Sequence, residues 1–224
     1  MFVANASHEL RTPVTSVIGQ VEVGLIKPRS ESEYTAILSS ILDDVQNMKT
    51  IINSFLDLAE ASIVAENHQF KVLRTDEMLF AVKDEILKRK PQYDIHIEFE
   101  NLPEDEMEVS IMGNERLLRI LFLNLIDNAC KFTDHNRVFI KIGYDSFYVT
   151  LRFIDNGIGI PKDELDLIFR PLYRATNTTG KSGHGIGLSI VKRIAEIHQA
   201  DIDIKSAVNI GTSVTIKFLN ARHF

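Results

Sequence analysis

The sequence predicts an α-helical hairpin followed by an α+β two-layer sandwich. Up to about residue 62, apolar residues recur at alternating spacings of three and four, the period of helices that pack side by side. Beyond that point, apolar and polar residues alternate in several short segments, as in strands with one buried face. Helical runs fall between these segments, which is typical of a sheet covered by helices. The 224 residues suffice for two domains of modest size.

Two apolar series mark the helices of the hairpin. They comprise Val3, Ser7, Leu10, Val14, Val17, Val21 and Gly24, and then Tyr34, Leu38, Ile41, Val45, Met48, Ile52, Phe55, Ala59 and Ser62. Between them, Pro28 ends the first helix, and Ser30 with Glu33 forms a capping box that starts the second. Two helices alone cannot cover both seams, so we expect a homodimeric four-helix bundle through residues 1–63. A monomer that docks its hairpin on the second domain is the alternative.

The second half of the chain is expected to hold a mostly antiparallel sheet and three helices. Strands are predicted at 95–99, 138–142, 147–153, 202–204 and 214–218, and helices near 76–90, 114–132 and 185–199. The segment IVAENHQ, residues 63–69, is the expected linker.

Composition excludes several classes of function. A net charge of −6 argues against nucleic acid as the main partner, because phosphate backbones recruit basic surfaces. The single cysteine, Cys130, rules out an intramolecular disulfide and favours a reducing compartment. The chain has neither a secretory signal nor an apolar run of about 18 residues. We therefore expect a soluble, cytoplasmic chain. Because the segment SHELRTP, residues 7–13, begins only seven residues from the N-terminus with little helix ahead of it, we also expect the chain to be a piece of a longer protein.

The segment NLIDNACKF, residues 124–132, carries a polar stripe on an apolar helix. Asn124, Asn128 and Lys131 share one face, because they are spaced at i, i+4 and i+7. Amide oxygens and an ammonium group suit a magnesium ion with phosphates. For this segment alone, a merely solvated polar face is an equally good interpretation.

Two glycine-containing segments follow. In DNGIGIP, residues 155–161, Asp155 could accept an exocyclic amino group, and Gly157 and Gly159 allow close approach of a flat base. An ordinary strand-end turn has the same composition. In TGKSGHGIGLSIVKRI, residues 179–194, glycines open an amphipathic helix whose free N–H groups could bind an anion. This segment lacks the Gly-Lys-Ser/Thr ending of a Walker loop and the βαβ context of a Rossmann fold.

In this order, the three segments resemble the N, G1 and G2 boxes of the GHKL ATPase superfamily, which includes gyrase, Hsp90, MutL and histidine kinases. IFRPLYRA, residues 168–175, resembles the F box of sensor histidine kinases, and GTS, residues 211–213, their closing glycine motif. SHELRTP, residues 7–13, resembles their H box. The resemblance implies a dimerisation and phosphotransfer domain over 1–63 and an ATP-binding domain of the Bergerat fold over 68–224.

The resemblance also implies roles for residues of the H box. His8 would accept the phosphoryl group, since a neutral imidazole is a competent nucleophile near pH 7. Glu9 would take the proton from the other ring nitrogen. Thr12, one helical turn after His8, would orient the water that dephosphorylates the partner. Thr15, Gly19 and Glu22 continue the same helical face and are candidate contacts of that partner, although an exposed face is the simpler explanation.

On the nucleotide side, the resemblance implies ATP and Mg²⁺ as cofactors. Asn128 would be the principal magnesium ligand, with Asn124 assisting, and Lys131 would contact phosphate. Asp155 would bind the adenine amino group, and Phe132 would stack on the base. Further nucleotide contacts are implied for Gly157, Gly159, Ile160, Arg174, Gly183, Gly185, Ile186, Gly187, Leu188 and Thr212. Residues of about 160–185 would form a mobile lid.

The implied reaction is autophosphorylation of His8 by ATP, followed by transfer to an aspartate in the receiver domain of a response regulator. Phosphatase activity toward that regulator and membrane attachment through sensor segments outside this chain are further expectations. Two alternatives stay open at this point. One is a GHKL ATPase in which ATP drives dimer closure without phosphotransfer. The other is a nonenzymatic scaffold that dimerises and senses nucleotide.

Overall fold

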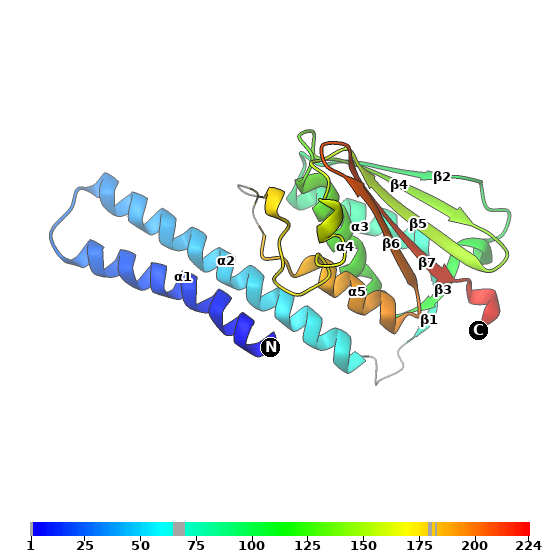
Figure 1. Cartoon of the computed structure of the whole chain (residues 1–224), viewed down its shortest axis with the longest axis horizontal. Coiled ribbons are helices and arrows are strands. Elements are labelled where there is room, and N and C mark those ends of the chain that lie inside the picture. Colours follow the sequence, from blue (N-terminus) through cyan, green and yellow to red (C-terminus); the bar gives the residue numbers. More distant parts are fainter. Residues whose placement is uncertain (1, 65–69, 179–180, 182) are drawn as a thin grey trace. The chain divides into compact units, whose positions relative to one another are not determined.

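The computed structural model describes residues 2–64, 70–178, 181 and 183–224, and the side chains of residues 2–10 and 58–64 are outside the description. The chain divides into two compact units, residues 1–57 and 58–224 (Figure 1). Within the described residues, no helix combines the length and apolar character needed to cross a membrane.

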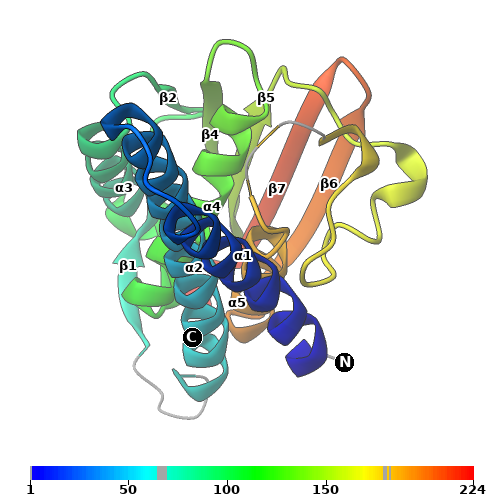
Figure 2. The ribbon, with the colours of Figure 1, turned by 90° about the vertical axis from the view of Figure 1, so that its left-hand side faces the viewer.

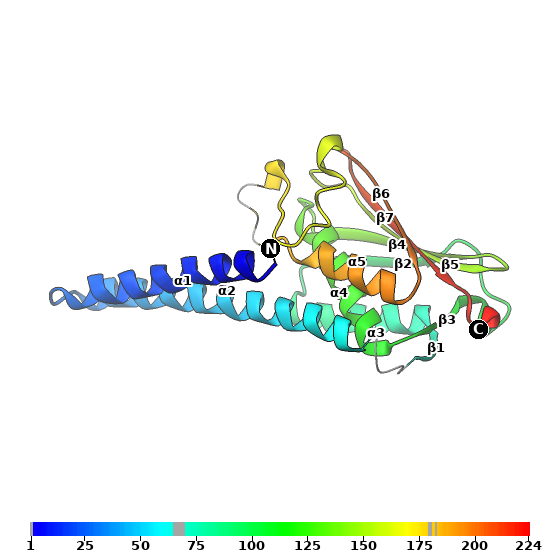
Figure 3. The same cartoon turned by 60° about the horizontal axis from the view of Figure 1, so that its bottom comes forward.

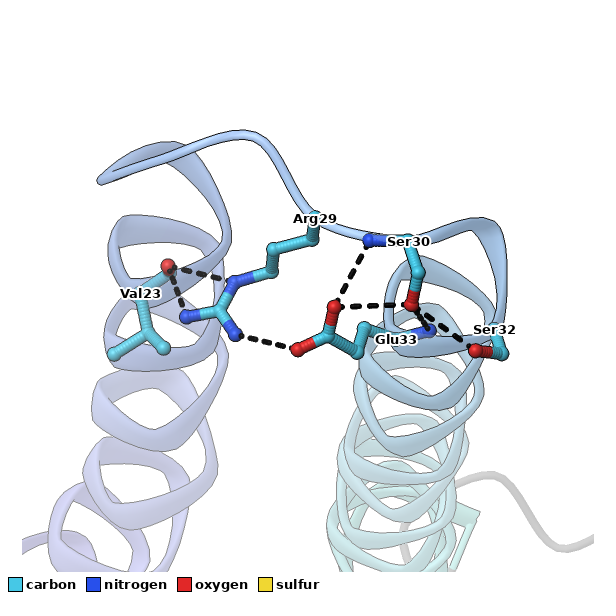
Figure 4. Close-up of polar contacts among 5 residues, drawn as sticks. All are labelled: Val23, Arg29, Ser30, Ser32 and Glu33. Carbon is cyan, nitrogen blue, oxygen red and sulfur yellow. Dashed lines mark hydrogen bonds and ion pairs between the residues drawn. The ribbon is translucent and has the colours of Figure 1, made fainter.

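The first unit is a helical hairpin, as predicted. Helices α1 (Phe2–Leu25) and α2 (Glu31–Val64) run side by side in opposite directions (Figure 3). The predicted capping box forms at the start of α2 (Figure 4). The Ser30 N–H donates to Oε2 of Glu33 at 2.9 Å, and the Glu33 N–H donates to the Ser30 hydroxyl at 3.3 Å. Arg29 links this cap to α1 by donating to the Val23 carbonyl at 3.0 Å.

The predicted apolar series divides between two faces of the hairpin. On the inner face, Gln20 donates to Asp44 at 3.0 Å, and a Cβ on Gly24 would lie 3.8 Å from Ile37. The outer face carries apolar side chains that are 38 to 64% exposed. We call this face the outer stripe, and its residues are Val14, Ile18, Val21, Leu38, Leu42 and Val45. The helical period was therefore predicted correctly, but it could not separate the two faces.

The second unit is a two-layer sandwich of helices on a mixed sheet, which confirms the predicted class (Figure 2). The sheet has the order β2-β4-β5-β7-β6, and its pairs are antiparallel except β2 with β4. Its strands are β2 (Asp94–Phe99), β4 (Arg137–Tyr144), β5 (Tyr148–Asp155), β6 (Asp201–Ala207) and β7 (Gly211–Leu219). Helices α3 (Thr75–Arg89), α4 (Glu115–Lys131) and α5 (Gly187–Ile197) cover one face of it.

A second, two-stranded sheet was not predicted. It pairs β1 (Lys71–Arg74) antiparallel with β3 (Ser110–Gly113). Each strand has only four residues, too few to show alternation, and the partners lie far apart in the chain. Short 3₁₀ helices occur at Glu106–Val109, Lys162–Glu164, Thr176–Thr178 and Ala221–His223.

The core of the sandwich lies between the sheet and the three helices. Its fully buried large side chains include Phe122 and Leu121 of α4, Phe153 of β5 and Phe218 of β7. Cys130 is buried with them, and burial raises the pKa of its thiol to about 12, so it is a packing residue. One face of α4 packs into this core. The opposite face is therefore oriented toward α5 and the glycine-rich segment.

Candidate nucleotide site

The polar stripe of α4 lies between its buried face and α5. Leu121 and Leu125 are buried, whereas Asn124, Asn128 and Lys131 are half-buried. The Asn124 side-chain N–H donates to the Ile120 carbonyl at 2.8 Å, one turn back on the helix. That bond fixes the amide and turns its oxygen toward the first residue of α5.

Glycines of the third segment approach this stripe closely. A Cβ on Gly187 would lie 2.8 Å from Oδ1 of Asn124 and 3.4 Å from Nδ2 of Asn128. Gly183 has a φ of +129°, and a Cβ there would lie 2.3 Å from Nζ of Lys131. Two amides, an ammonium group and the N-terminus of α5 thus converge. This donor set fits a triphosphate with a magnesium ion, since hard cations take oxygen ligands and helix N-termini attract anions.

Asp155, at the end of β5, is fixed by backbone donors. Its Oδ1 accepts from the N–H groups of Gly157 at 2.9 Å and of Thr212 at 3.2 Å. Burial raises the pKa of this carboxyl, against the lowering effect of the two hydrogen bonds. Gly157 and Gly159 cannot carry side chains, because a Cβ would lie 2.4 Å from the Phe132 carbonyl oxygen and 2.0 Å from that of Ala207, respectively.

Ser206 joins this turn to the closing strand and was missed in the sequence. Its hydroxyl accepts from the Ile160 N–H at 2.9 Å, donates to the Gly211 carbonyl at 2.9 Å and lies 2.8 Å from the Thr212 hydroxyl. Ser206 and Thr212 are paired across β6 and β7. A serine in an alternating strand carries no sign of this role, because the pairing register is a tertiary property.

Hydrogen bonds hold the described part of the predicted lid in place. Glu164 is buried and accepts from the Thr176 hydroxyl at 2.6 Å and from its N–H at 3.0 Å. Asn177 donates to the Gly159 carbonyl at 2.9 Å. Arg174 donates to the carbonyls of Thr178 and Lys181, so its guanidinium bonds to the lid backbone here. Residues 179, 180 and 182, which the lid prediction includes, lie outside the described residues.

Lys131 and Phe132 lie together at the end of α4. The ammonium nitrogen is 5.1 Å from the centroid of the Phe132 ring, a cation–π distance. Burial lowers the pKa of Lys131, the charge of Asp127 opposes that shift, and the charges of Arg174, Lys90 and Lys181 add to it.

The structure brings most of the predicted nucleotide residues into two groups. One holds Asn124, Asn128, Lys131, Gly183 and Gly187, and the other holds Phe132, Asp155, Gly157, Gly159, Ile160 and Thr212. Gly185 has a φ of +68° and lies against the Tyr173 carbonyl, so it shapes the turn before α5. Ile186 is buried and Leu188 half-buried at the start of α5. His8 and Glu9 lie on α1, but their side chains are outside the described residues, whereas Thr12 is described and exposed.

This fold and this arrangement define a nucleotide-binding domain that follows a helical hairpin along the chain. Residues 113–222 match the family of histidine kinase-, DNA gyrase B- and HSP90-like ATPases, which implies ATP binding. Residues 1–62 match the His Kinase A (phospho-acceptor) domain. The chain belongs to the sensor histidine kinases of two-component systems, in which these two domains form the kinase core.

Several curated sensor kinases are similar to this chain over most of its length. The phosphate regulon sensor protein PhoR of Pseudomonas aeruginosa is 29% identical over 99% of this chain and 50% of its own length. The histidine-protein kinase ArlS of Staphylococcus aureus is 29% identical over 97% of this chain and 48% of its own length. Hybrid signal transduction histidine kinase A of Dictyostelium discoideum is 32% identical over 94% of this chain and 10% of its own length. The chain therefore spans half or less of these relatives.

Solved histidine kinases share the fold. The Acinetobacter baumannii histidine kinase AdeS aligns with a TM-score of 0.67 and 22% identity, over 95% of this chain and 98% of that one. The histidine kinase ThkA, solved in complex with the response regulator protein TrrA, aligns with a TM-score of 0.72 and 20% identity, over 99% of this chain and 62% of that one. At this identity the likeness concerns the fold alone.

Proposed function

We propose that this chain autophosphorylates His8 with ATP and passes the phosphoryl group to an aspartate of a response regulator. The observation that carries the proposal is the convergence of Asn124, Asn128 and Lys131 with the N-terminus of α5. It occurs in a chain whose first 62 residues match a phospho-acceptor domain. The proposed domains are residues 1–63 for dimerisation and phosphotransfer and residues 68–224 for ATP binding.

The α4 stripe would hold the triphosphate. Asn128, assisted by Asn124, would offer amide oxygens to Mg²⁺, which when bound neutralises charge on the phosphates. Lys131 would pair with phosphate oxygens, and the free N–H groups at the start of α5 would add donors. Phosphoryl transfer asks the protein mainly for such positioning and charge balance.

The β5 turn would recognise the base. With Oδ1 of Asp155 bonded to two backbone N–H groups, the carboxylate is oriented to accept from the adenine amino group. Gly157 and Gly159 would contact the base through their backbone, since neither position has room for a side chain, and Thr212, bonded to Asp155 and Ser206, would complete the polar edge. The contacts assigned to Ile160, Arg174, Gly183, Gly185, Ile186, Gly187 and Leu188 belong to the same proposal.

At the phospho-acceptor, one ring nitrogen of His8 would attack the γ-phosphorus while the bond from that phosphorus to the ADP oxygen breaks. The other ring nitrogen would give its proton to Glu9, which keeps the imidazole nucleophilic. Thr12 would orient the water that removes the phosphoryl group from the regulator. This last role makes the protein a phosphatase toward the same partner.

The proposed assembly is a homodimer with a response regulator as partner. The outer stripe of the hairpin exposes Ile18 at 51% and Leu42 at 55%, and such a stripe is buried when two hairpins form a four-helix bundle. The complex of ThkA with the response regulator protein TrrA supports a response regulator as the partner.

The test uses γ-labelled ATP with Mg²⁺ on the chain and on its His8→Gln variant. Acid-labile, alkali-stable label that is absent from His8→Gln is the expected result. Label retained by the variant would overturn the assignment of His8. Phosphate release without labelled protein, from a chain that binds ATP, would overturn the kinase proposal in favour of an ATPase without phosphotransfer.

A further inference from the structure

A polar cluster outside the proposed contacts joins the end of α3 to α4. Nζ of Lys90 donates to the Tyr93 hydroxyl at 3.0 Å and binds Oδ1 of Asp127. The Tyr93 hydroxyl donates to the same Oδ1 at 2.9 Å. Tyr93 is buried, whereas Lys90 and Asp127 are 42% and 40% exposed. We call Lys90, Tyr93 and Asp127 the Asp127 cluster.

The position of Asp127 on α4 makes its charge consequential. It precedes Asn128 directly and precedes Lys131 by four residues, the spacing at which an acid and a lysine attract each other on a helix. An unbalanced carboxylate there would draw the Lys131 ammonium away from the phosphates and would repel a polyanion. A nucleotide-binding helix therefore needs a counter-charge for Asp127.

Lys90 supplies this counter-charge. Burial works to lower the pKa of Lys90, but its hydrogen bonds to Asp127 and Tyr93 and the charge of Asp127 outweigh burial, so the pKa is raised. Lys90 is consequently an ammonium at neutral pH. Burial lowers the pKa of Lys131, and the charge of the same carboxylate offsets this only in part, so Asp127 interacts with both lysines.

We propose that Lys90 is a positioning residue for nucleotide binding, which by pairing with Asp127 leaves the Lys131 ammonium to the phosphates. The inference rests on the proposed function, because it takes Lys131 as a phosphate ligand. Tyr93 contributes by donating to Oδ1 of Asp127, the same oxygen that Lys90 binds.

The test is a double-mutant cycle on the whole chain, with MgATP affinity measured by calorimetry. Lys90→Met keeps the apolar stem, and Asp127→Asn keeps an acceptor for the Tyr93 hydroxyl. We expect Lys90→Met to weaken MgATP binding about fivefold to tenfold, an effect that shrinks at high salt. Asp127→Asn alone should stay within about twofold of wild type, and the double variant should recover to that range.

Two further variants separate pairing from other effects. Lys90→Arg should bind like wild type, because arginine restores the pair with Asp127. Lys88→Met removes an exposed lysine from the last turn of α3 and should change the affinity for MgATP less than about twofold. Unfolding temperatures of all variants are measured alongside.

Three results would overturn the inference. Unchanged affinity in Lys90→Met would show that Asp127 needs no counter-charge. If Asp127→Asn alone raised the affinity for MgATP as much as Lys90→Met lowered it, the two charges would act independently on the nucleotide, without pairing. If the double variant bound MgATP as weakly as Lys90→Met and both had a lower unfolding temperature, Lys90 would have a structural role. Failure of the wild-type chain to bind MgATP would instead contradict the proposed function.

Discussion

Gly187 and Asn124 face each other so closely that residue 187 has no room for a side chain: its Cβ would lie 2.8 Å from Oδ1 of Asn124. This contact sets the distance between the N-terminus of α5 and the polar stripe of α4. Position 187 requires glycine because of these neighbouring atoms. The backbone conformation does not require it, since residue 187 is helical and not left-handed. The proposed phosphate site therefore depends on the absence of one methyl group.

Gly187→Ala is expected to weaken MgATP binding about tenfold or more, because the Asn124 amide must move to admit the methyl group. The unfolding temperature should hardly fall, since the displaced atom ends a side chain and alanine is the better helix former. Calorimetry and thermal unfolding measure the two effects. Gly19→Ala, where nothing lies within 4 Å, is the matched control and should bind like wild type.

Glu164→Ala is expected to release the lid from its anchor, because Glu164 accepts both bonds from Thr176. Faster proteolysis between residues 162 and 178 and MgATP affinity lower by about threefold should follow, as a looser lid must be ordered on binding. Asp163→Ala changes the exposed neighbouring acid and should have neither effect. Equal proteolysis of the two variants would contradict the anchor.

The second unit should lose stability as the pH falls below about 6.5, through His198. Its Nε2 accepts from the Asn114 N–H at 3.0 Å, its Nδ1 lies 2.8 Å from the Ile194 carbonyl, and the ring is buried against Phe70 and Phe218. Burial lowers the pKa of His198, against the raising effect of its bond to Ile194. The neutral ring is therefore the folded form.

The direction of this pH dependence follows from proton binding. Below the pKa of histidine in the unfolded chain, about 6.5, the unfolded chain binds a proton that the folded chain does not bind. The stability that is present above this pH therefore falls until the pH reaches the lower pKa of His198 in the folded chain. Thermal unfolding by circular dichroism between pH 8 and 5.5 measures it. His198→Gln should be less stable at pH 8 and less sensitive to pH, whereas His223→Gln should follow wild type. Equal pH sensitivity of all three would exclude His198.

Leu42→Glu is expected to convert the proposed dimer to a monomer, because it places a charge on the outer stripe. Sedimentation velocity at several concentrations measures the change. Ser39→Glu adds the same charge at an exposed position outside the outer stripe and should leave the dimer intact. A wild-type chain that sediments as a monomer at all concentrations would refute the dimer itself.

The features that could be predicted from the sequence are those encoded over short distances along the chain. The capping box of Ser30 and Glu33 needs residues three apart, and the α4 stripe needs residues within two helical turns. The turn at Asp155 is equally local. Such patterns were sufficient to predict the hairpin and the sandwich class, whereas the proposed nucleotide residues came from the resemblance of three segments to the GHKL boxes.

The sequence by itself thus determined which residues could take part in the chemistry, whereas the tertiary structure decided which of them meet. The pairing of β1 with β3, the bond of Ser206 to Ile160 and the pair of Lys90 with Asp127 all join residues more than thirty positions apart. No local period reports such contacts, because they depend on the register of strands and on how helices pack over the sheet. The roles inferred for Ser206 and Lys90 followed only from the fold.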